Sequence, residues 1–258
     1  MRLARKVAYT ASLFMTFLAS SCTSSHLPIV DESLQKSTTF QLAMIGVRSY
    51  SMLSSSPASN GQVFYGRAFS LYNDNGVLKL YSNGMIGELS GEPIAVLSIG
   101  KDKKAMLLED SFGQNYVVIL SEKGEKKMYV YRINSEKIEY DSENFLDFEK
   151  IFVAGRLMLT VGRNELRLYS YENGLLSLKK TIKNEGEVKV FSSHFFSSFI
   201  VMKKNGECII LGEVEGETKI PPSSYNAALY YDGRIKKTYV VIFDEGGNVQ
   251  ELYEVEEQ

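Results

Sequence analysis

The chain has 258 residues, of which 44% are hydrophobic and 12% aromatic, and it carries a formal net charge of −2 at pH 7. This apolar content is enough for the core of one large domain or two small ones. The charge balance gives no reason to expect nucleic-acid binding, which requires a net basic face. Of the two His and two Cys in the chain, only His194 and Cys208 lie beyond the first 26 residues, so a zinc site of three or four such ligands at close spacing is excluded.

Residues 1–21 have the layout of an export signal. Basic residues at the start are followed by an apolar stretch over residues 7–19 and by small residues before Cys22. The apolar stretch is too short to span a bilayer as a stable anchor. Removal of residues 1–21, which contain three basic and no acidic residues, leaves 26 basic and 31 acidic residues and a net charge of −5.

The end of this signal resembles the lipobox of bacterial lipoproteins in the sequence Leu18-Ala19-Ser20-Ser21-Cys22. In that family the cysteine becomes the first mature residue and receives acyl chains, so we expect lipidation at Cys22 and attachment to a membrane. Thr23 follows the cysteine, which in that family implies sorting to the outer membrane. The alternative is an ordinary signal-peptidase cut at the same bond, because Ala19 and Ser21 also satisfy the small-x-small rule.

Residues 22–39 are rich in Ser and Thr and show no periodicity, which is typical of a flexible tether. His26 lies in this tether, and we expect it to be solvated. The folded domain is therefore predicted to span residues 40–258. Its first strand is predicted at residues 40–47, and residues 53–61, LSSSPASNG, are predicted to form a loop.

The stretch 151–178 is the unit that the rest of the domain repeats. Apolar residues alternate with polar ones from Leu157 to Val161, and the alternation resumes at Leu166 after a Gly-Arg-Asn break. This period of two, with a turn between, indicates a hairpin with one buried face. With the apolar residues before it and the strand after the next Asn-Gly break, residues 151–178 are predicted to contain three short strands.

Similar units recur along the chain. A short apolar-polar strand follows a turn at residues 77–81, 126–131, 165–169, 207–211 and 249–253. The last residues of these units are 50, 38, 42 and 42 positions apart, and a period of 40 to 45 residues is typical of four-stranded propeller blades. Each unit is preceded by another apolar strand, at residues 68–72, 116–120, 157–161, 195–202 and 238–243.

These repeats predict an all-β fold, a β-propeller of about five or six four-stranded blades. A small twisted sheet cannot bury both of its faces alone, so it must stack on copies of itself, and a ring leaves only short edges exposed. The predicted strand at residues 40–47 would complete the ring beside the C-terminal blade. A β-sandwich with accidental regularity is the alternative.

The repeat VAGRLMLTVGRNELRLYSYENG resembles the quinoprotein-type, or PQQ-like, propeller repeats. Together with Cys22 and the polar tether, it resembles the BamB family, the propeller lipoproteins of the outer-membrane β-barrel assembly machinery. The resemblance implies a periplasmic scaffold with envelope protein partners. No partner-binding residue is transferred from that family, because no motif matches it position by position, and no cofactor is expected.

Candidate catalytic side chains are sparse in the predicted domain. His194 lies at a predicted strand start without a nucleophile motif, so we interpret it as structural. Cys208 alternates into an apolar strand and is interpreted as a buried thiol without a disulfide partner. We therefore expect no catalytic, cofactor-binding or metal-binding residues and assign only Cys22, as the lipidation site.

Carboxylates leave one enzymatic alternative open, a propeller hydrolase that acts on glycans with paired acids near the central channel. Asp110, Asp232 and Asp244 are the candidates, although turns favour Asp for local hydrogen bonding. The segment from Asn73 to Gly76 is interpreted as a hairpin turn and not as half of a calcium loop. The basic residues are scattered singly or in pairs, as on solvated faces. A surface lipoprotein that binds a host or glycan ligand is the further alternative.

Overall fold

The computed structural model describes residues 43, 44, 46, 47 and 50, and then 53–82, 91–121, 126–134, 137–172, 175–233 and 235–257. The expected signal, the tether and Cys22 lie outside these residues. The described part is almost entirely β-structure. It contains no helix long and apolar enough to cross a membrane.

The strands form five antiparallel sheets, which we number as blades 1 to 5. Blade 1 contains β1 (Val63–Tyr65), β2 (Phe69–Asp74), β3 (Val77–Ser82) and β4 (Ala95–Ser98), and blade 2 contains β5 (Lys103–Glu109), β6 (Asn115–Ser121), β7 (Lys127–Asn134) and β8 (Lys137–Phe145). Blade 3 contains β9 (Lys150–Ala154), β10 (Leu157–Val161), β11 (Glu165–Glu172) and β12 (Leu175–Lys183). Blade 4 contains β13 (Val188–Ser193), β14 (Ser198–Lys203), β15 (Glu207–Gly212), β16 (Gly216–Lys219) and the short β20 (Glu256–Glu257), and blade 5 contains β17 (Asn226–Asp232), β18 (Lys237–Phe243) and β19 (Val249–Glu254).

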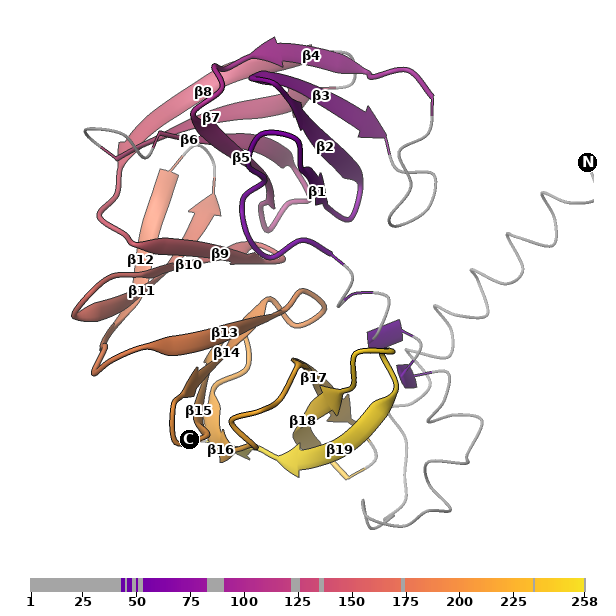
Figure 1. Cartoon of the computed structure of the whole chain (residues 1–258), viewed down its shortest axis with the longest axis vertical. Helices are drawn as coiled ribbons and strands as arrows, with labels where there is room; N and C mark the ends of the chain where they lie inside the picture. The colour runs from indigo at the N-terminus through magenta and orange to yellow at the C-terminus, as the bar shows by residue number, and fades with distance from the viewer. Residues whose placement is uncertain are drawn as a thin grey trace, which may run out of the picture.

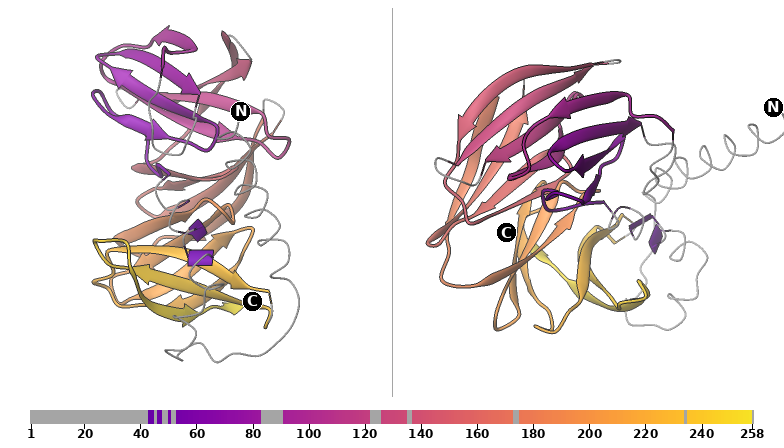
Figure 2. Two further views of the ribbon diagram at one scale, coloured as in Figure 1. Left: turned by 90° about the vertical axis from the view of Figure 1, so that its right-hand side faces the viewer. Right: turned by 45° about the horizontal axis from the view of Figure 1, so that its top comes forward.

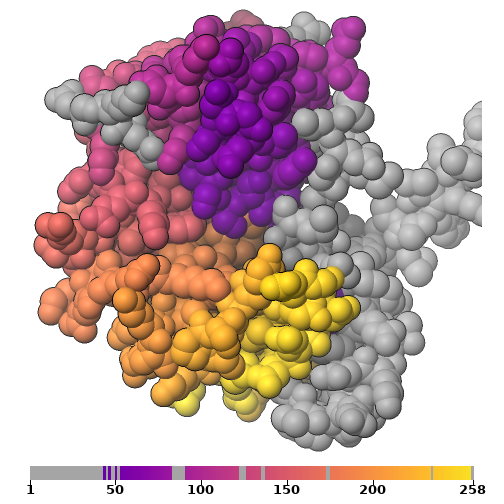
Figure 3. Space-filling view, viewed as in Figure 1, coloured from indigo at the N-terminus to yellow at the C-terminus, as the bar shows by residue number. Residues whose placement is uncertain are grey.

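The blades follow one another around a central axis (Figures 1 and 2). The first strand of each sheet lies toward the axis, and β4, β8 and β12 lie at the periphery (Figure 1). Contacts join β2 to β5, β9 to β13 and β13 to β17. In the space-filling view, blades 1 to 5 form one continuous body from indigo to yellow (Figure 3). This arrangement is a β-propeller, which confirms the predicted fold class.

The hydrophobic core lies between the blades. Leu71 of blade 1, Met106 of blade 2 and Val153 of blade 3 belong to one buried cluster, and Leu159 of blade 3 and Phe199 of blade 4 belong to another. A third cluster joins blades 4 and 5. Strands β6 and β10 are covered on both faces, so β10 is buried at all five of its residues, and such strands read as continuous apolar runs.

The turns agree with the sequence prediction. Asn75 and Gly76 connect β2 to β3 with φ of 53° and 85°, the backbone that a two-residue hairpin turn requires. A Cβ on Gly76 would lie 2.7 Å from the backbone of Gly100 and Lys101. Glycine therefore also lets this turn pack against the connection to blade 2.

The repeat units were placed correctly. The five positions that end the repeated motif, residues 81, 131, 169, 211 and 253, all lie in the third strand of a blade. The stretch 151–178 contains parts of four strands instead of three, because the apolar residues before Gly155 form β9 as a separate strand that pairs with β10.

The predicted strand at residues 40–47 is wrong where the structure describes it. Ala43, Met44, Gly46 and Val47 are helical. Met44 is buried in a cluster with side chains of β17 and β18 in blade 5. The segment therefore lies beside the C-terminal blade, as expected, but it covers a face of that blade with apolar side chains.

The last blade also departs from the predicted four strands. The described part of blade 5 has three strands, and the chain after β19 pairs with blade 4 as β20. Val255 is buried in the cluster between blades 4 and 5. A Cβ on Gly216 would lie 2.5 Å from the Val255 side chain and 2.6 Å from the Glu256 carbonyl oxygen, so glycine at this position permits the close approach.

The predicted strand at residues 195–202 begins three residues later, at Ser198. Residues 194–197 form a turn in which Ser197 has a φ of 43°. The Ser198 hydroxyl donates to the Phe196 carbonyl oxygen at 2.8 Å and accepts from the Val214 N–H at 3.0 Å. These side-chain hydrogen bonds stabilise the turn against continuation of the strand.

Candidate functional site

Residues 53–62, which we call the axial segment, run along the innermost strands of blades 1 to 3. Its Ser54 N–H donates to the carbonyl of Tyr65 in blade 1 at 2.8 Å. Ala58 exchanges two backbone hydrogen bonds, of 2.7 and 3.0 Å, with Ala105 in blade 2. The predicted loop is therefore bonded to the innermost strands, and Leu53 and Ala58 are buried.

Asn73 holds the axial segment to two blades. It is fully buried in β2, and its side-chain amide donates to the carbonyl oxygens of Lys103 at 3.1 Å and Ala58 at 3.4 Å. Its backbone N–H donates to the Gln62 carbonyl at 3.0 Å. These contacts give Asn73 a structural role in joining blades, which the sequence interpretation of a simple hairpin residue missed.

A small cavity of about 30 Å³ remains at one end of the axis. Its lining includes Arg67, Glu109, Gly155 and His194, which lie at or after the ends of the innermost strands of blades 1 to 4. The Arg67 guanidinium and the Glu109 carboxylate are 3.6 Å apart. The volume accommodates about one water molecule, so this cavity is too small for an organic substrate.

His194 faces this cavity from the turn after β13. The backbone N–H of Gly155 donates to His194 Nδ1 at 3.2 Å, so the neutral ring carries its proton on Nε2. Nε2 is buried without a hydrogen-bond partner among the described residues. Burial, with a smaller contribution from the charge of Arg67, lowers the pKa of His194 to about 4. The ring is therefore neutral at physiological pH and is not paired with a nucleophile.

The structure does not bring the three candidate aspartates together. Asp110 lies in the turn after β5 in blade 2, whereas Asp232 and Asp244 lie at opposite ends of β18 in blade 5. Asp110 accepts from the N–H groups of Phe112 and Gln114, both at 2.9 Å. Hydrogen bonds from Asn248 to the Asp244 carboxylate lower its pKa. Asp110 and Asp244 thus order their own turns.

A hydrogen-bonded network crosses the interface between blades 2 and 3. The Tyr116 hydroxyl donates to Asp110 at 3.0 Å, and the Tyr171 hydroxyl donates to Asp141. The two rings meet edge to face with centroids 4.8 Å apart. Burial and the bond to Asp110 raise the pKa of Tyr116 to about 12. Both tyrosines are therefore protonated donors that hold the carboxylates in place.

Cys208 is buried in β15, as expected. Its thiol lies 3.5 Å from the Gly206 carbonyl oxygen, and burial raises its pKa to about 12. Among the described residues, no group of three His, Cys, Asp or Glu side chains could hold a metal ion.

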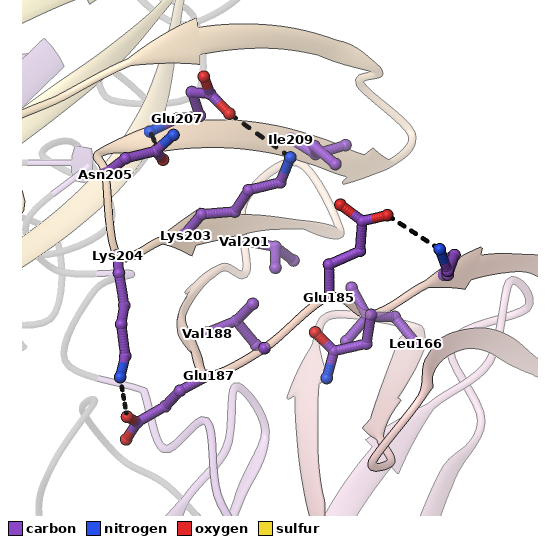
Figure 4. A pocket seen from close by; sticks show the side chains of 13 residues that line it. Leu166, Glu185, Glu187, Val188, Val201, Lys203, Lys204, Asn205, Glu207 and Ile209 are labelled. Atoms are coloured by element: carbon purple, nitrogen blue, oxygen red, sulfur yellow. Dashed lines mark hydrogen bonds and ion pairs between the residues drawn. The ribbon is translucent and has the colours of Figure 1, made fainter.

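Larger openings lie between blades 3 and 4. One cavity, of about 340 Å³, extends from Leu166 in β11 to Ile209 in β15, and a second, of about 510 Å³, lies beside Lys150 and Phe152 of β9. Both are lined by Glu187, Val188, Lys203 and Lys204, so they form one depression, which we call the blade 3/4 groove. Figure 4 shows the lysine–glutamate pairs around the outer half of the groove.

No protein-family model and no curated protein sequence matches the chain. Among solved structures, similarity is found to Kluyveromyces lactis Hsv2, with 10% identity, a TM-score of 0.44 and coverage of 77% of this chain and 63% of that chain. Chaetomium thermophilum Raptor is 11% identical with a TM-score of 0.45, and the match covers 80% of this chain and 21% of that chain. The dihydro-heme d1 dehydrogenase NirN is 12% identical with a TM-score of 0.42, and the match covers 86% of this chain and 54% of that chain. The chain thus spans less than two thirds of each of these proteins. At these values the similarity says nothing about activity or partners.

Proposed function

We propose that this protein is a non-enzymatic scaffold for protein–protein interactions, held by acyl chains on Cys22 at the bacterial outer membrane and facing the periplasm. The resemblance of its repeats to the BamB family suggests outer-membrane β-barrel assembly as the setting. The lipobox-like residues 18–22 support the anchor, and the following tether would separate the membrane from the propeller.

The observation that carries the scaffold role is the surface of the outer strands β4, β8 and β12. Each is the last strand of its sheet, so one edge carries backbone N–H and C=O groups that no further strand of that sheet pairs. Five apolar side chains on these strands are more than half exposed, Val96, Tyr140, Phe145, Leu175 and Leu178. Exposed edges with apolar side chains suit the addition of a partner strand.

The positions of the candidate aspartates speak against the hydrolase alternative. Glycoside hydrolysis requires two carboxyl groups within about 10 Å of each other on either side of a sugar. Asp110 lies in a turn of blade 2, whereas Asp232 ends β17 and Asp244 follows β18 in blade 5. These positions favour a binding role over catalysis.

Metabolic labelling with a palmitate analogue tests the anchor. Wild-type protein is expected to incorporate label and to fractionate with the outer membrane, whereas Cys22→Ser is expected to do neither. Wild-type protein without label would show that residues 18–22 are an ordinary cleavage site.

Photo-crosslinking in cells tests the scaffold role. A photoreactive residue is placed at Phe145 or Leu175 on the outer strands, with Lys101 and Glu245, exposed in turns elsewhere, as matched controls. The outer-strand positions are expected to capture discrete partner proteins and the turn positions none. If all four positions give the same products, the outer strands are not a binding surface. If the outer strands capture partners but no barrel-assembly component is among them, the scaffold role stands and its setting in β-barrel assembly is refuted.

A further inference from the structure

The blade 3/4 groove has an apolar floor. Val188 and Val190 of β13, Phe152 of β9 and Ile209 of β15 are partly buried and pack on the cluster between the two blades. Met202 of β14 is buried beside them. The floor runs from the innermost strands β9 and β13 outward to β11 and β15, so it is long as well as apolar.

The rim of the groove is basic in a protein that is acidic overall. Five lysines and three glutamates line the two cavities, and the half nearest the axis has four lysines and one glutamate. The lysines are Lys150, Lys183, Lys189, Lys203 and Lys204. The mature chain is expected to carry a charge of −5, so this local excess attracts a negatively charged partner.

Three of these lysines can exchange partners at small cost. Lys183 and Glu185 are 3.1 Å apart, Lys203 and Glu207 3.5 Å, and Lys204 and Glu187 3.2 Å. All six side chains are at least 43% exposed. Such exposed pairs contribute little to stability, because water and salt screen their charges. A carboxylate from a partner could therefore replace the glutamate without a large loss.

We infer that the blade 3/4 groove binds an extended segment of a partner protein in which acidic and apolar residues alternate. Successive side chains of an extended chain point to opposite sides. Apolar side chains at every second position would lie on the floor, and the acidic side chains between them would reach the lysine rim. This inference rests on the proposed scaffold function and specifies the chemistry of one partner segment.

The apolar floor distinguishes this occupant from a simple anion. Inorganic phosphate or a nucleotide phosphate would use the lysines and leave Val188, Val190 and Phe152 uncovered. An anionic lipid surface would meet the rim lysines, but the floor lies between two blades and is bounded by Glu187 and Glu207. The alternating segment is the occupant that uses both the charge and the apolar strip.

Fluorescence anisotropy with the Cys22→Ser mature chain tests this inference. The probe is a short labelled peptide of alternating Glu and Leu, and its twins carry Lys in place of Glu or Ser in place of Leu. The Glu-Leu peptide is expected to bind, and both twins are expected to bind at least about tenfold more weakly. The variant Lys150→Gln/Lys204→Gln should weaken binding about tenfold, since two charge contacts with the acidic side chains are lost.

Two further variants make the result specific. Lys101→Gln/Lys236→Gln removes the same charge from exposed turns outside the groove and should leave binding unchanged. Lys150→Glu/Lys204→Glu should invert the preference, so that the Lys-Leu twin binds better than the Glu-Leu peptide. A gain of binding cannot result from misfolding.

Each contrary outcome overturns the inference. Equal binding of the Ser twin would show a plain anion site, and binding of phosphatidylglycerol vesicles without peptide binding would show a membrane-facing surface. No peptide binding, while Phe145 and Leu175 capture partners in cells, would refute the groove and leave the scaffold function intact. By contrast, peptide binding without crosslinks at Phe145 and Leu175 would refute the outer strands as a binding surface and support the groove.

Discussion

The backbone N–H of Val153 donates to the carbonyl oxygen of Ser55 at 2.8 Å. Val153 lies in the innermost strand of blade 3, and Ser55 belongs to the axial segment that precedes blade 1. With the bonds to Tyr65 and Ala105, this contact links the axial segment to three blades. These bonds hold the innermost strands of the three blades to one segment and contribute to the stability of the propeller.

Asn73→Asp should destabilise the protein by about 3 kcal/mol or more at pH 8. The substitution preserves shape, but it replaces the amide that donates to the Ala58 and Lys103 carbonyls with a buried acceptor, and an unpaired buried charge is costly. Urea unfolding measures the change. The loss should be smaller at pH 5, because a protonated carboxyl group donates again.

Asn115→Asp is the matched control for that substitution. The Asn115 amide donates to the Gly113 carbonyl in a solvent-exposed hydrogen bond, so its replacement should change the free energy of unfolding by less than about 1 kcal/mol. Similar losses for both variants would contradict the structural role of the axial segment.

Gly76→Ala should cost about 2 kcal/mol more than Gly61→Ala. The two glycines have nearly the same backbone, with φ of 85° and 78°, so the strain of an alanine at positive φ is the same in both. A Cβ on Gly61 would meet nothing within 4 Å, whereas on Gly76 it would lie 2.7 Å from Gly100 and Lys101. The difference therefore measures only the packing between blades 1 and 2.

Thermal or urea unfolding of both glycine variants checks this prediction. The contrast would disappear if the Asn75-Gly76 turn did not pack on the connection to blade 2. Equal stabilities of the two variants would thus contradict the arrangement of these blades.

The blade pattern could be predicted from the sequence because each blade repeats local information. Alternation and turn residues recur in every unit. The alternation from Leu166 to Tyr169 predicts a strand from local sequence alone, without knowledge of distant contacts. Blade boundaries that depend on single close approaches could not be predicted. Gly216 permits β20 to pair with β16 only because Val255 and Glu256 lie against it in the fold.

The surfaces that could bind a partner depend on distant residues. Lys150, Lys189 and Lys204 lie on different strands or turns, and in the sequence they look like scattered solvated charges. Only the packing of blade 3 against blade 4 collects them on one rim. Residues 53–61 form the loop that the sequence predicts, with one isolated bridge at Ala58. The place of this loop in the fold could not be predicted, since its hydrogen-bond partners belong to strands that follow it in the chain.

Cys208 should resist thiol reagents in the native protein. With its pKa raised to about 12 by burial, the thiolate fraction at pH 8 is about 10⁻⁴, compared with about 0.2 for an exposed cysteine. In the Cys22→Ser background, its reaction with an aromatic disulfide reagent should be more than about 1,000-fold slower than that of a Ser223→Cys thiol added at an exposed turn. Rapid labelling without denaturant would contradict the burial of β15.

His194 should make the stability of the protein depend on pH between 7 and 5. Its pKa in the folded state is about 4, below the value of about 6.5 in an unfolded chain. In this range the unfolded state binds the extra proton, so stability is retained above pH 6.5 and lost as the pH falls toward 4. The expected loss between pH 7 and pH 5 is about 2 kcal/mol.

His194→Asn keeps an acceptor for the Gly155 N–H and cannot titrate, so its free energy of unfolding should show a weaker pH dependence by this amount. Urea unfolding at the two pH values measures the difference, and the other titrating groups cancel because both proteins contain them. Parallel pH profiles for wild type and variant would show that His194 is not buried at the end of the axis.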